Sequence, residues 1–99
     1  MAYAASKIIK PSAGILYGLT GYNSKASAQF VQIHDAASLP SEAAVPVLVF
    51  KVAALDNFFL DLGPYGVNFA NGIVVCNSST AETKTIGSAD CWFNRESFR

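Results

Sequence analysis

Hydrophobic and polar residues alternate over short segments along most of the chain, and no segment of useful length repeats with the period of a helix. Alternation with a period of two is typical of β-strands with one buried face. The pattern predicts seven or eight short strands: residues 13–22, 28–34, 45–52, 57–62, 67–70, 73–77 and 89–95, with a shorter one at 83–86. Such a series without helices predicts an all-β fold, a single antiparallel β-sandwich or small barrel.

The segment from Gly63 to Thr80 carries the clearest turn signal. Its Asn71-Gly72 dipeptide lies between two apolar alternating runs, and both residues tolerate the positive φ angles of a two-residue type I′ turn. The sequence therefore predicts a β-hairpin centred on this dipeptide. Its register would place four side chains on one buried face: Val67, Phe69, Val74 and Cys76.

Residues 1–12 show no clear period, contain Lys7 and Lys10, and include no acidic residue. We interpret them as an N-terminal arm that precedes one β-sandwich domain over residues 13–99, a length that suits a single domain. Two interpretations of the arm stay open. It is either a loosely held terminus or a basic segment that lies on an acidic neighbour in an assembly.

Composition narrows the classes of partner. Seven basic and seven acidic residues give zero net charge, which argues against nucleic acid as a partner. Charged residues make up 14% of the chain, against about 25% in an average soluble domain. A surface with few charges loses little hydration when it is covered, which favours a subunit surrounded by copies of itself or by a larger partner. The longest apolar run, 43–55, is interrupted by Pro46 and Lys51 and is too short to span a membrane.

The two cysteines, Cys76 and Cys91, do not have metal-ligand spacing. The first residues also lack the apolar segment of a secretory signal, so we expect reduced thiols. The predicted register points both side chains inward, where they would pack as small apolar groups.

Catalytic chemistry is poorly represented. The single histidine, His34, precedes Asp35, but neighbouring residues of a strand point to opposite faces. A pair of carboxylates for glycoside hydrolysis would have to come from three aspartates whose spacing favours no pair: Asp56, Asp61 and Asp90. No glycine-rich phosphate loop is present, and nothing requires a cofactor. The sequence predicts a protein without enzymatic activity.

Three aromatic residues fall on strand positions opposite the predicted core: Phe30, Phe59 and Trp92. Large outward-facing aromatic side chains on separate strands are typical of contact surfaces. We interpret them as part of a subunit interface, together with Lys7 and Lys10 of the arm. Two alternatives remain: a second packed layer within the same domain, and stacking on sugars.

Several turn and strand segments carry a resemblance: G-Y-N at 21–23, A-Q-F-V-Q-I-H-D at 28–35, the strand with Pro46 at 45–52, and F-A-N-G-I-V-V-C-N-S-S-T at 69–80. From residue 13 onward the chain resembles small β-sandwich proteins from tailed-bacteriophage structural gene clusters. The resemblance implies a virion component, a capsid decoration or cement protein that is assembled in the host cytoplasm. Its partners would be the major capsid protein or other virion proteins, and copies of itself in a symmetric oligomer.

The alternative function is a carbohydrate- or receptor-binding module of a phage fibre or spike. It requires an aromatic residue such as Trp92, Tyr17 or Tyr65 on one open platform, next to polar residues such as Asn94 and Asp90.

Overall fold

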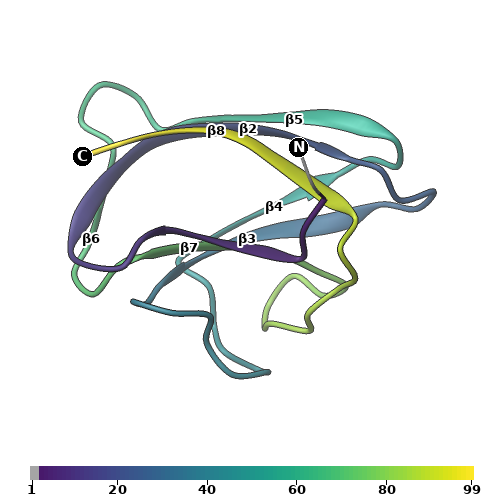
Figure 1. Cartoon of the computed structure of the whole chain (residues 1–99), viewed down its shortest axis with the longest axis horizontal. Helices are drawn as coiled ribbons and strands as arrows, with labels where there is room; N and C mark the ends of the chain where they lie inside the picture. The colour runs from purple at the N-terminus through teal and green to yellow at the C-terminus, as the bar shows by residue number, and fades with distance from the viewer. Residues whose placement is uncertain (1–2) are drawn as a thin grey trace.

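The computed structural model describes residues 3–99, and Met1 and Ala2 lie outside the described part. Residues 3–99 form eight strands and no helix (Figure 1). The strands are β1 (Ser6–Lys10), β2 (Gly14–Asn23), β3 (Gln29–Asp35), β4 (Leu48–Val52), β5 (Asp56–Asp61), β6 (Val67–Phe69), β7 (Ile73–Ser78) and β8 (Cys91–Phe98). They form two stacked antiparallel sheets, which confirms the predicted β-sandwich.

The two sheets use strands that are distant in the sequence. The first sheet has the order β1-β7-β3-β4. In the second sheet β2 is central, because residues 18–23 pair with β5 and with β8 at once, so these two strands flank it. The short strand β6 pairs with the beginning of β2. Every strand pair is antiparallel.

The hydrophobic core fills the space between the sheets. Phe58 of β5 contacts Phe50 of β4 and Phe93 of β8, with 5.9 and 6.2 Å between ring centroids. Removing these apolar surfaces from water is the main stabilising contribution to such a fold. The core residues are Ile9, Leu16, Leu19, Val31, Ile33, Val52, Phe58, Phe69, Ile73, Val75, Cys91 and Phe93.

The strands predicted at 13–22, 28–34 and 57–62 lie within two residues of β2, β3 and β5. The strand predicted at 89–95 corresponds to β8, which continues further, to Phe98. Two backbone hydrogen bonds between Ile15 and Arg99, of 2.8 and 2.9 Å, extend its pairing with β2 to the end of the chain. Period-two alternation therefore located these strands well.

The predicted hairpin at Asn71-Gly72 is wrong. β6 pairs with β2 in one sheet and β7 pairs with β1 and β3 in the other, so the dipeptide crosses between the sheets. Neither residue has a positive φ. The carboxylate of Asp35 instead accepts hydrogen bonds from the backbone N–H groups of residues 70, 71 and 72. These bonds, above all the one from Asn71, lower the pKa of Asp35.

Packing explains the glycine at this crossing. A Cβ on Gly72 would collide with the carbonyl oxygens of Ala36 and Lys10. The predicted face is also wrong for β7, since Val75 belongs to the core whereas Cys76 points to the other side of the sheet and contacts Gln32. Both cysteines are nevertheless buried, free thiols, and Cys91 is in the core as predicted.

The interpretation of residues 1–12 as an arm is wrong for Ser6–Lys10, which form β1 at the edge of the first sheet, against β7. Lys7 and Lys10 are therefore sheet residues, and the part of the arm at residues 1–2 lies outside the described chain. The strand predicted at 45–52 corresponds to β4, which begins later. It enters the sheet only at Leu48 and pairs with β3 alone, at the opposite edge.

Candidate functional site

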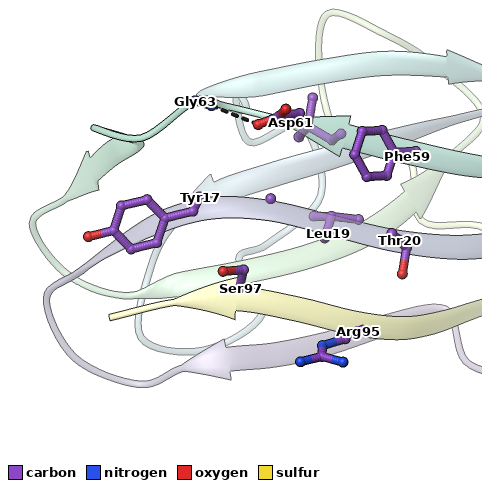
Figure 2. A pocket seen from close by; sticks show the side chains of 10 residues that line it. Tyr17, Leu19, Thr20, Phe59, Asp61, Gly63, Arg95 and Ser97 are labelled. Carbon is purple, nitrogen blue, oxygen red and sulfur yellow. Dashed lines mark hydrogen bonds between the residues drawn. The ribbon is translucent and has the colours of Figure 1, made fainter.

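The outer surface of the second sheet, made by β5, β2 and β8, is called the open face here. Thr20 at its centre pairs with Phe59 on one side and with Arg95 on the other. Gly18, two residues earlier, pairs with Asp61 and Ser97. Directly opposite residues of neighbouring strands share a face, so these side chains surround Gly18. They line a groove of about 290 Å³ (Figure 2).

Gly18 creates the hollow in this face. A Cβ at this position would lie 2.6 Å from the carbonyl oxygen of Leu60, so close packing of β5 on β2 requires glycine. The register of β2 and β8 also shifts between Leu16 and Gly18, which leaves Tyr17 without a partner in β8. Such a bulge reorients a side chain. Figure 2 shows the Tyr17 ring at one end of the groove and the Phe59 ring toward the other.

Polar side chains lie on both sides of the groove. Asp61 of β5 is exposed, and its Oδ1 accepts a 2.9 Å hydrogen bond from the N–H of Gly63. Arg95 of β8 is also exposed, and the two ion pairs found within residues 3–99 involve other residues. The groove therefore combines two aromatic rings with one acidic and one basic group. That combination can hold a small polar ligand by stacking and hydrogen bonding.

The five residues predicted as an interface do not share one surface. Phe59 and Trp92 both lie on the open face, where Phe59 is 73% exposed and Trp92 is half-buried. Phe30 lies on the outer side of the first sheet, between Ser78 and Lys51 of the adjacent strands.

The two lysines lie on β1. Lys7 spans from β1 to β8 of the other sheet and forms a 2.8 Å ion pair with Glu96. Lys10, half-buried, ends the same strand. Lys7 therefore links the two sheets at one edge of the sandwich.

The outer surface of the first sheet is different and is called the covered face here. The loops 36–47 and 79–90 lie below this sheet in Figure 1, on the side away from the second sheet. Gln32 of β3 points outward beneath them, and its Nε2 donates to the backbone carbonyls of residues 80, 81 and 83 at 2.9–3.2 Å. Its Oε1 lies 3.0 Å from Nε2 of His34. Because this oxygen only accepts, the neutral histidine carries its proton on Nε2.

A buried lysine connects the two loops. Lys84 is 3% exposed and its ammonium forms an ion pair with Glu42. Backbone hydrogen bonds of 2.8 Å join Lys84 to Ala43 and to Ala44. The N–H of Ile86 also donates to the Glu42 carboxylate. The hydrogen bond from Lys84, followed by that from Ile86, lowers the pKa of Glu42.

Burial also changes the two titratable side chains beneath the loops. It lowers the pKa of His34, and the positive charge of Lys84 lowers it further. Burial raises the pKa of the Cys76 thiol to about 11. Both groups are therefore neutral near pH 7, as expected in a site that serves packing, and a protonated thiol is a poor nucleophile.

The free edge of the first sheet carries a group of three exposed apolar residues. It consists of Val45, Val47 and Val49, which are 76, 49 and 41% exposed and which we call the edge valines. They lie on or just before β4, which has β3 as its one neighbour in the sheet. An edge strand presents unpaired backbone groups to any chain that approaches it.

Sequence reasoning considered Asp61 only as a catalytic carboxylate and missed the grouping of polar residues in the groove. Thr20, Asp61, Arg95 and Ser97 meet there only because β2 pairs with both β5 and β8, a register that no local pattern gives. It also missed the burial of Lys84. This residue lies in the strand predicted at 83–86, where the structure has only an isolated bridge between Ile86 and Ser78. The loop segment 80–83, whose backbone carbonyls accept hydrogen bonds from Gln32, has no sequence signal of its own.

Comparison with protein-family models, with curated proteins and with solved structures gives no significant match for this chain. Within residues 3–99, no helix has the length and apolar character needed to cross a bilayer. The same residues contain no group of three or more His, Cys, Asp or Glu side chains that could hold a metal ion.

Proposed function

We propose that this chain is a non-catalytic structural subunit of a phage virion, a decoration or cement protein that binds the outside of a capsid shell. The observation that carries the proposal is the set of edge valines, which lie along the free edge at β4. The resemblance of residues 13–99 to small β-sandwich proteins of tailed phages supports the major capsid protein, or another virion protein, as the partner.

Edge geometry and composition support this function together. β-branched residues are strongly enriched in strands, and a partner strand added to β4 would pair its free backbone groups while covering the valines. Natural proteins commonly protect such edges with charges or proline. In the segment 45–52, Pro46 and Lys51 lie near the two ends, and the four residues between them, 47–50, are all apolar and uncharged. Because only 14% of the residues in the chain are charged, covering this surface removes little water from charged side chains.

Repetition would add to the affinity. A decoration protein binds many equivalent positions on a shell. When its copies also contact one another, the first contact holds the other binding surfaces close to their partners, so several weak contacts together give a high overall affinity. We therefore expect the protein to form a symmetric oligomer, in solution or on the shell. Its role requires no catalytic residue.

The test compares phage capsid particles that were assembled in the presence of this protein with particles that were assembled in its absence. We expect electron microscopy to show extra regular density on the outer shell only when the protein is present, and light scattering to give a mass above that of a monomer. The double variant Val47→Lys, Val49→Lys places two charges on the edge and should abolish binding to particles. Tyr65→Lys, at a position that is 90% exposed in the β5–β6 turn, is the matched control and should bind normally.

A monomer that never associates with particles would refute the proposal. Equal binding by the double variant and the control would refute the edge at β4 as the contact surface.

A further inference from the structure

The groove on the open face combines features that binding through β4 does not use. We propose that this groove binds a neutral oligosaccharide, with Tyr17 and Phe59 stacking on sugar rings and with Asp61 and Arg95 hydrogen-bonding to hydroxyl groups. The groove lies in the second sheet and the edge valines lie beside the first, so this site does not depend on the proposed function.

The aromatic rings provide apolar faces toward solvent. Phe59 is 73% exposed, and Tyr17 stands at the other end of the groove (Figure 2). The face of an aromatic ring is electronegative and attracts the C–H groups of an apolar surface. A pyranose ring presents such a C–H face and carries its hydroxyl groups around the rim. Two rings separated by a polar stretch therefore suit a carbohydrate better than a purely apolar ligand.

The polar side chains of the groove can form hydrogen bonds with the hydroxyl groups of a sugar. Asp61 uses Oδ1 for the N–H of Gly63, and its Oδ2 makes no hydrogen bond within residues 3–99. Asp61 and Arg95 lie on the strands that flank β2 and are offset by two residues along the strand, so their backbones are roughly 12 Å apart. A ligand above Gly18 can thus donate to the carboxylate and accept from the guanidinium. Each hydroxyl group of a sugar can donate one hydrogen bond and accept another.

The charge balance selects a neutral ligand. The groove is lined by one acidic and one basic side chain, Asp61 and Arg95. The negative charge of Asp61 would offset part of the attraction between Arg95 and a bound carboxylate or phosphate. A sugar without charged substituents meets no such repulsion.

The same lining indicates binding rather than hydrolysis. Glycoside hydrolysis ordinarily uses two carboxyl groups that flank the scissile bond. Asp61 is the one carboxylate among the residues that line the groove. A volume of about 290 Å³ in an open groove is near the lower end of ligand sites. It suits a short part of a glycan chain that continues across the sheet.

The experiment is a titration of the full chain, labelled with ¹⁵N, followed by two-dimensional NMR. The probes are five neutral hexasaccharides (cellohexaose, maltohexaose, xylohexaose, mannohexaose and N-acetylated chitohexaose) and one anionic probe, hexagalacturonate. We expect at least one neutral probe to shift the amide signals of Gly18, Phe59, Gly63 and Ser97 in the millimolar range. Phe59→Ala should weaken that binding about tenfold, and Asp61→Asn should weaken it less.

Tyr65→Ala is the matched control, because Tyr65 is an exposed aromatic residue outside the groove, and it should bind as the unmodified chain does. The dispersion of the amide signals shows at the same time that each variant is folded. The proposal is overturned if none of the five neutral probes shifts the groove signals. It is also overturned if binding persists unchanged in Phe59→Ala, or if hexagalacturonate binds more tightly than every neutral probe.

Discussion

The outer faces of the two sheets handle polar residues in opposite ways. On the covered face, Gln32 and His34 are buried beneath two loops and Lys84 is buried where the loops meet, and each has a hydrogen-bond or ion-pair partner. On the open face, Asp61 and Arg95 remain exposed beside an exposed Phe59. The same pleated strand geometry thus supports a second internal layer on one side and an accessible groove on the other.

The difference shows where stability and where binding can reside. Buried polar groups must be paired, because an unpaired one loses its hydration without compensation. A substitution on the covered face therefore affects several partners at once and should destabilise the fold. Exposed side chains on the open face can be substituted with little loss of stability, so they are available to contact a ligand. Substitutions on the two faces can test this contrast directly.

The largest effect is expected for Gln32→Leu, which keeps the side-chain size and removes its hydrogen bonds. Three loop carbonyls lose their donor and His34 loses its acceptor. The free energy of unfolding should fall by about 2–4 kcal/mol. Urea denaturation measures the loss, with Thr20→Val on the open face as the control, expected within about 0.5 kcal/mol. Equal losses for the two variants would erase the distinction between the faces.

The next effect is a loss of stability in acid that depends on His34. Unfolded His34 takes up a proton as the pH falls through its ordinary value of 6.5, while burial and Lys84 lower the pKa in the folded chain. The unfolded state then binds more protons, so the free energy of unfolding decreases as the pH falls from about 6.5 toward the folded pKa. Other groups that face this site are Cys76, which is neutral over that range, and Glu42.

His34→Gln removes this titration and should flatten the stability profile between about pH 7 and pH 5. The lowered pKa values of Glu42 and Asp35 act in the same direction, from their ordinary values of 4.5 and 3.8 downward, and both variants keep that contribution. Urea denaturation at each pH gives the two profiles. Parallel profiles would contradict the role given to His34.

A smaller effect is expected for Glu42→Gln, which leaves the buried Lys84 ammonium without its carboxylate. The melting temperature should fall, because a buried charge that loses its partner is destabilising. Adding Lys84→Met removes the charge with little change in side-chain length and should restore part of the loss. Thermal unfolding of the single and double variants measures this. If the double variant melts below Glu42→Gln, the ion pair is not what joins the loops.

The smallest effect on stability is expected for Phe59→Ala. The ring is 73% exposed and lies outside the core cluster, so its removal should change the free energy of unfolding by no more than about 0.5 kcal/mol. Urea denaturation provides the value. A loss comparable to that of Gln32→Leu would show that Phe59 stabilises the fold and would weaken its assignment to a binding groove.

Alternation predicted most of the strands because one face of each lies in the core, as Phe58 and Phe59 of β5 illustrate. It misjudged segments whose pairing depends on distant residues. Asn71-Gly72 has the sequence of a tight hairpin, yet the carboxylate of Asp35 binds its backbone and the flanking strands join different sheets. The groove around Gly18 likewise depends on which strands flank β2, and no nearby residue encodes that choice.

The placement of the two thiols gives this protein a pair of built-in reporters. Cys76 lies beneath the loops and Cys91 lies in the core, and burial raises the pKa of each thiol to about 11. A thiol reagent such as an aromatic disulfide can therefore modify Cys76 once the loops detach from the sheet. It can modify Cys91 only after the two sheets separate. The order in which the two sites are labelled would distinguish partial opening from complete unfolding without any added probe.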